Sequence, residues 1–143
     1  MNRLIKNINK ILYTGNHTNV NFKKHVLTSL NEYNGTDWYQ YKLEPSVNNY
    51  EKNIIFRNRK YSLELLSWGG DSYMPIYDPV FMKKLQGNLD IYNSNTYNNQ
   101  LDSIFYINDT SGNIQIFNDM AYKTSYSLHL YFPGFYETKF YWG

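Results

Sequence analysis

The sequence contains no cysteine, and this absence excludes three kinds of chemistry. A disulfide framework, a thiol nucleophile and a thiolate metal site all require a cysteine side chain. Long apolar runs are also missing, although a membrane-spanning helix needs about 20 apolar residues in succession. The first residues alternate polar and apolar side chains and lack the apolar segment of a signal peptide. We therefore expect a soluble, intracellular protein that makes no membrane contact.

Charge is sparse as well. Charged residues make up 18% of the chain, and the net charge is +2. So weak a field does not favour binding to nucleic acid, and we expect no nucleic-acid partner. The hydrophobic content is 42% over 143 residues, which is typical of a globular protein with one core. We expect a single domain that spans residues 1–143.

The first third of the chain has apolar residues at helical spacing. One stripe lies on one face of a helix, and a second follows after Gly15-Asn16, which breaks the pattern. The two stripes comprise Leu4, Ile5, Ile8, Ile11 and Leu12, and then Phe22, Val26, Leu27 and Leu30. We expect a helical cap over about residues 1–45.

From Ile54 the pattern changes to short runs of β-branched and aromatic residues. Turn residues such as Gly69-Gly70-Asp71 and Ser111-Gly112 separate these runs. The predicted strands are 54–57, 61–66, 80–82, 89–92, 104–107, 114–117 and 125–131. Many short strands after a helical segment predict a mainly β domain, an antiparallel sandwich or barrel over about residues 53–143.

Several of these segments resemble, in order, those of the cysteine dioxygenase family. The segments are Arg57-Asn58, Lys60-Tyr61-Ser62-Leu63, Trp68-Gly69, Ile76-Tyr77-Asp78, Leu85-Gln86-Gly87-Asn88-Leu89, Tyr106-Ile107-Asn108-Asp109, Gly112 and Ser127-Leu128-His129-Leu130-Tyr131. No single segment is specific, but so many in register make a strong signal. The resemblance implies a cupin-type β-barrel, a double-stranded β-helix, with an N-terminal helical cap.

The resemblance also implies which metal ligands are missing. The family oxidises a thiol to a sulfinate with O₂ at an iron held by three histidines. The positions similar to those histidines carry Tyr77, Pro79 and Ile114. Neither proline nor isoleucine has a side-chain lone pair to donate. We therefore expect no iron site, no metal and no cofactor.

Other residues resemble the substrate end of the family's pocket. Arg57 is similar to an arginine that binds the substrate carboxylate, while His129 and Tyr131 are similar to a histidine and a tyrosine beside the iron. Because side chains alternate along a strand, His129 and Tyr131 are expected on one face, opposite Leu128 and Leu130. We expect Arg57, His129 and Tyr131 to converge inside the barrel. The alternative for Arg57 is a pairing with an acidic neighbour or with Tyr131.

The stretch 131–143 is densely aromatic and has two interpretations. It can form the last barrel strand and cover the core. Alternatively it is a docking surface for a protein partner or a larger assembly, since tyrosine and tryptophan are enriched in interfaces. The family continues with further strands, and we expect a partner chain to cover these rings instead.

These observations lead to one principal hypothesis and two alternatives. The principal one is a catalytically inactive cysteine-dioxygenase-like cupin reused as a structural or protein-binding module. The chain is rich in residues with A/T-rich codons, such as its 16 tyrosines, which indicates an AT-rich genome. The hypothesis therefore extends to a virion component of a large DNA virus. The first alternative is a module that binds a small amino or thiol carboxylate through Arg57. The second is an active thiol dioxygenase with atypical ligands. An oxygen-rich site of Tyr77, Asp78 and His129 would not restore the family reaction, because tyrosinate favours Fe(III).

Overall fold

The computed structural model describes residues 1–14, 19–93, 99–100 and 103–133. Two helices, α1 (Asn2–Thr14) and α2 (Asn19–Glu32), are followed by the 3-10 helix Asp37–Tyr41. The strands are β1 (Tyr50–Arg57), β2 (Ser62–Trp68), β3 (Tyr73–Pro75), β4 (Val80–Gln86), β5 (Leu89–Asn93), β6 (Asn99–Gln100), β7 (Ile104–Ile107), β8 (Ile114–Asn118) and β9 (Ser125–Tyr131). The predicted mainly β, antiparallel fold with an N-terminal helical cap is confirmed.

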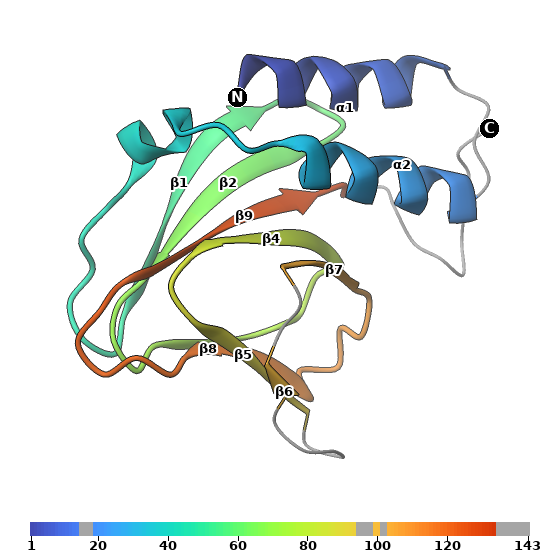
Figure 1. Cartoon of the computed structure of the whole chain (residues 1–143). Coiled ribbons are helices and arrows are strands. Elements are labelled where there is room, and N and C mark those ends of the chain that lie inside the picture. The colour runs from blue at the N-terminus through green and yellow to red at the C-terminus, as the bar shows by residue number, and fades with distance from the viewer. Residues whose placement is uncertain (15–18, 94–98, 101–102, 134–143) are drawn as a thin grey trace.

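The described strands form two antiparallel sheets rather than one continuously hydrogen-bonded barrel. One sheet has the order β1-β2-β9-β4-β7, and the other has the order β3-β8-β5-β6. Figure 1 shows both helices lying over the first sheet, on the side away from β5, β6 and β8. The first sheet is therefore the middle layer, with helices on one face and the second sheet on the other.

Two apolar clusters fill the spaces between these layers. The outer cluster joins the helices to the first sheet and includes Leu4, Ile8, Phe22, Val26, Leu30, Leu63, Leu65, Leu128 and Leu130. The inner cluster lies between the sheets and includes Leu66, Trp68, Val80, Met82, Leu89, Ile107 and Ile116. Because β2 contributes to both clusters, every residue of β2 is buried. The helical stripes read from the sequence are the residues that face the first sheet.

Two strands were not predicted. Strand β3 has three residues and ends at Pro75. A proline in so short a segment indicates a turn and not a strand. Strand β6 has only two residues and pairs with Asp90 and Ile91 of β5. Strands this short carry too few side chains for a period-2 pattern. Residues 134–143, on which the proposed docking surface depends, lie outside the described residues.

Lys83 of β4 fastens the end of α2 to the first sheet. Its ammonium group donates to the carbonyl oxygens of Leu30 (2.7 Å) and Tyr33, which lie at the C-terminal end of the helix. The Leu30 carbonyl also accepts from Tyr33 N over 3.2 Å, and a cation near the C-terminal carbonyls of a helix is favourable. Burial lowers the pKa of Lys83. A single lysine thus satisfies the end of α2 and holds it to β4.

We expect Lys83→Met to lower the free energy of unfolding by about 1–2 kcal/mol, since charge-assisted hydrogen bonds are lost while the aliphatic stem is kept. Urea unfolding followed by circular dichroism measures the change. Lys24→Met, at an exposed position on α2, is the matched control and should change stability by less than about 0.5 kcal/mol. Equal stability of the two variants would contradict the assigned role of Lys83.

Candidate functional site

A chain of hydrogen bonds crosses the face of the first sheet that is turned toward the second sheet. The indole Nε1 of Trp68 donates to Ser127 Oγ over 2.8 Å. Ser127 Oγ is 2.8 Å from His129 Nε2, and His129 Nδ1 is 3.1 Å from the Tyr131 hydroxyl. Residues 127, 129 and 131 share a face of β9 because side chains alternate along a strand. Leu128 and Leu130 point the other way and pack against the helices.

His129 is completely buried and has both ring nitrogens occupied by these contacts. Burial lowers the pKa of His129 to about 3, with a smaller contribution from the positive charge of Lys52. The imidazole is therefore neutral at physiological pH, with one nitrogen donating and the other accepting. Burial, followed by the nearby charges of Glu64 and Asp78, raises the pKa of Tyr131. Its phenol stays protonated.

A pocket of about 260 Å³ opens beside Tyr131, at the mouth of the space between the two sheets. We call it the mouth pocket. Strand β1 contributes Tyr50 and Lys52, strand β2 contributes Glu64, strand β9 contributes Tyr131, and the segment from β3 toward β4 contributes residues 74–78. Tyr77 and Asp78 lie in this last segment. The pocket thus combines aromatic rings with three charged side chains.

Glu64 is the buried charge of the mouth pocket. Its side chain is only 6% exposed. Ser62 Oγ donates to Glu64 Oε2 over 2.8 Å, and Arg57 Nη2 lies 3.9 Å from the same oxygen. The other oxygen, Oε1, is buried and has no hydrogen-bond partner among the described residues. A buried carboxylate oxygen in this state leaves an acceptor unused.

The structure places Arg57 differently from His129 and Tyr131. Arg57 is the last residue of β1 and pairs with Ser62, after an irregularity in the strand between Ile54 and Phe56. Its side chain is 59% exposed and does not line the mouth pocket. The expected convergence of all three residues inside the barrel is therefore not what the structure shows. The alternative, a pairing of Arg57 with an acidic neighbour, describes its contact with Glu64.

The three positions that resemble iron ligands do not form a donor set. Ile114 packs against the inner cluster, and Pro79 lies in the segment just before β4. Tyr77 is 62% exposed and lies beside Gly112, where a Cβ would stand 2.6 Å from its ring. The backbone brings Tyr77 and Ile114 close together, because Ile76 N donates to Ile114 O. Isoleucine and proline donate nothing to iron, so these residues do not fit the family's metal.

No group of three or more histidine, aspartate and glutamate side chains lies close enough to hold a metal ion within the described part of the chain. In the same residues, no helix combines the length and the apolar character needed to cross a bilayer.

Glu64, Ser127 and Trp68 were missed in the sequence. Glu64 carried a usable signal, since it is a lone charge within the apolar run Leu63-Glu64-Leu65-Leu66. It pairs directly with His129 across the ladder, but that register is a property of the folded sheet. Ser127 lies two residues before His129, and the same alternation that pairs His129 with Tyr131 would have included it.

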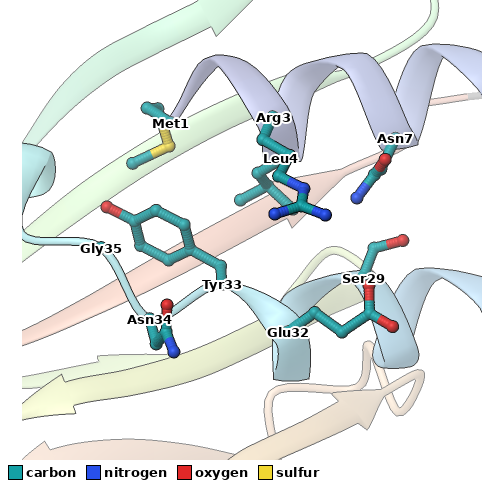
Figure 2. Close-up of a pocket in the computed structure, with 9 residues that line it drawn as sticks. All are labelled: Met1, Arg3, Leu4, Asn7, Ser29, Glu32, Tyr33, Asn34 and Gly35. Carbon is teal, nitrogen blue, oxygen red and sulfur yellow. The ribbon is translucent and has the colours of Figure 1, made fainter.

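A second cavity, of about 470 Å³, lies in the helical cap. Figure 2 shows it between the start of α1 and the end of α2, with Arg3 and Asn7 extending from α1 toward α2. Its charged side chains, Arg3 and Glu32, are exposed. The mouth pocket is smaller, but it contains a buried charge and lies beside the residues that the sequence singled out. We therefore take the mouth pocket as the candidate site.

No protein-family model matches this sequence, and no curated protein does. Solved structures do match. The protein TT1209 from Thermus thermophilus has a TM-score of 0.56 at 10% identity, over 68% of this chain and 95% of that one. A protein with a double-stranded β-helix domain from Klebsiella pneumoniae has a TM-score of 0.54 at 11% identity, over 72% and 92%. A cupin superfamily protein from Desulfitobacterium hafniense has a TM-score of 0.50 at 12% identity, over 63% and 83%.

These likenesses, together with the two facing sheets, show that the chain has a cupin fold. At such low identities they establish the fold alone. The narrower resemblance to cysteine dioxygenases rests on the sequence segments, and the role of the site must be argued from its residues.

Proposed function

We propose that this chain is a non-catalytic cupin of the cysteine-dioxygenase type that works as a structural or protein-binding module. One observation carries the proposal. The inner wall, where the resemblance implies an iron centre, holds the neutral and fully buried His129 with both nitrogens engaged by Ser127 and Tyr131. A metal would have to compete with these hydrogen bonds for a lone pair. Both ring nitrogens of His129 thus have hydrogen-bond partners without a metal.

The contact between Arg57 and Glu64 favours this proposal over carboxylate binding through Arg57. Glu64 Oε2 lies 3.9 Å from the guanidinium, so a carboxylate of the chain itself already stands beside Arg57. An incoming carboxylate would meet the negative charge of Glu64 at the same place. The alternative of a small amino or thiol carboxylate held by Arg57 is therefore the weaker one.

The outer face of the second sheet supports a surface role. The helices cover only the first sheet in the described part of the chain (Figure 1). On the second sheet, Tyr73 is 58% exposed and Tyr92 is 40% exposed, and both line a hollow with Asp71 and Asp119. Exposed tyrosines of this kind are common in protein interfaces. With the A/T-rich composition, the proposal extends to a component of a large DNA virus particle.

We expect the purified chain to contain sub-stoichiometric iron, nickel and zinc, and to form no cysteine sulfinate from cysteine and O₂. Elemental analysis after chelation and an assay with added Fe(II) measure both quantities, with an active cysteine dioxygenase tested in parallel. The reason is that the three ligand positions carry Tyr77, Pro79 and Ile114. Near-equimolar metal together with sulfinate formation would instead establish the remaining alternative, an active dioxygenase with atypical ligands.

A further inference from the structure

The charge of the mouth pocket is predominantly negative. Among its lining residues, Glu64 and Asp78 carry carboxylates and Lys52 carries the one positive charge. Glu64 is nearly buried, whereas Lys52 and Asp78 are exposed. Water screens the two exposed charges, but it screens a buried charge far less. Glu64 therefore dominates the interaction with anything that enters the pocket.

Glu64 also has an unused acceptor. Its Oε2 is occupied by Ser62 and lies near Arg57, while Oε1 has no partner among the described residues. Burying a charged oxygen without a hydrogen bond is costly, and a donor that reaches it is correspondingly favourable. Arg57 compensates the charge only partly, because it is 3.9 Å from Oε2 and 59% exposed. The missing element is a hydrogen-bond donor, ideally one with a positive charge.

Aromatic rings form much of the remaining wall. Tyr50, Tyr77 and Tyr131 all line the mouth pocket. The face of an aromatic ring is electronegative, and it attracts organic cations within about 6 Å. Met74, Pro75 and Ile76 add an apolar floor. Aromatic walls around one buried carboxylate are suited to an alkyl or aryl group that ends in an ammonium.

We propose that the mouth pocket binds a small organic ammonium compound, with Glu64 as its counter-ion. The ammonium pairs with the carboxylate of Glu64, which lines the pocket, and the carbon skeleton lies among the tyrosine rings. The volume of about 260 Å³ lies below the range of pockets for drug-sized ligands, so the ligand is a small amine. Asp78 at the rim adds a second negative charge, and a carboxylate ligand is repelled by both.

The inference rests on the proposed function in one respect, namely that no metal fills the pocket. The experiment therefore uses full-length protein shown to be metal-free. Benzylammonium is the probe, and benzoate is the control ligand of similar shape and opposite charge. Titration followed by NMR should give saturable shifts for Tyr131 and Glu64 with benzylammonium. Benzoate should bind at least tenfold more weakly.

Variants assign the binding to Glu64. Glu64→Gln keeps the shape and an acceptor for Ser62, removes the charge, and should weaken benzylammonium binding at least tenfold. Asp78→Asn is exposed, should not disturb folding, and should weaken binding a few-fold through charge alone. Glu32→Gln, in the cavity of the helical cap, is the matched control and should leave binding unchanged. Circular dichroism establishes that each variant is folded.

Two results would overturn the inference. One is benzoate binding as tightly as benzylammonium. The other is benzylammonium affinity that is unchanged in both Glu64→Gln and Asp78→Asn. If Glu64→Gln does not fold, unchanged affinity in Asp78→Asn alone overturns the inference. Neither result bears on the proposed non-catalytic function. That function would be overturned by a stoichiometric metal together with sulfinate formation. The two proposals therefore fail separately.

Discussion

Replacing Asn118 with alanine is expected to lower the free energy of unfolding by about 3–5 kcal/mol, since several buried polar groups lose their partners at once. Asn118 is the last residue of β8 and is fully buried. Its Nδ2 donates to the carbonyl oxygens of Trp68 (2.9 Å) and Lys123 (2.7 Å). Its Oδ1 accepts from Ser125 Oγ over 2.9 Å. The side chain thus joins β8 of the second sheet to the end of β2 and the start of β9.

The effect is large because total stability is usually only about 5–15 kcal/mol. Asn118→Asp should be at least as harmful, because a carboxylate cannot donate to the two carbonyls. Asn113→Ala is the control, since Asn113 is exposed and bonds to Ser111 Oγ through its backbone nitrogen. Urea unfolding measures all three variants. A loss below about 1 kcal/mol for Asn118→Ala would show that Asn118 does not hold the sheets together.

Acid should destabilise the fold through His129. The pKa of His129 is lowered to about 3 in the folded state, while an unfolded histidine titrates near about 6.5. Between these two pKa values, His129 is protonated in the unfolded state and neutral in the folded state. The stability is fully present above about pH 6.5 and decreases as the pH falls below it. Between pH 7.5 and pH 5 the expected loss is about 2 kcal/mol, from about 1.4 kcal/mol per pH unit.

A comparison with His129→Gln isolates this contribution. Asp90 has the opposite effect, because burial and then Asp119 raise its pKa to about 6. The folded state binds that proton first and gains stability on acidification. Asp90 is present in both proteins, so its effect cancels in the difference. Glutamine does not titrate, so the stability difference between the two proteins should narrow by about 2 kcal/mol from pH 7.5 to pH 5. Parallel curves would contradict a neutral, buried His129.

The same neutral histidine links these predictions to function. If His129 stays unprotonated to pH 5, its hydrogen bonds to Ser127 and Tyr131 persist, and the wall of the mouth pocket keeps its shape. A pH dependence of ammonium binding would then arise from the carboxylates or the ligand and not from His129. The pH series on stability and the ligand titration therefore test different groups of one site.

Local patterns in the sequence were sufficient to predict the helices of the cap and most of the strands. Apolar spacing predicted that Leu4, Ile8 and the stripe from Phe22 to Leu30 lie on helix faces, and these residues pack on the first sheet. Period-2 alternation separated His129 and Tyr131 from Leu128 and Leu130. Both patterns depend only on the geometry of a single helix or strand. Such geometry is the same wherever the element lies in the fold.

Only the tertiary structure decided which residues meet at the site. The partnership of Glu64 with His129 and Arg57 depends on the register of β2 with β9 and β1. Arg57 is exposed at the end of β1, an edge strand of the first sheet, and its pairing with Ser62 is set by an irregularity near Ile55 that no local pattern signals. Lys83 bonds to Leu30 and Tyr33, which are 53 and 50 positions away. Asn118 bonds to Trp68, 50 positions away, as well as to nearer groups. Contacts over such sequence distances are set by how the layers pack. The local sequence of one segment does not specify which distant segment it contacts.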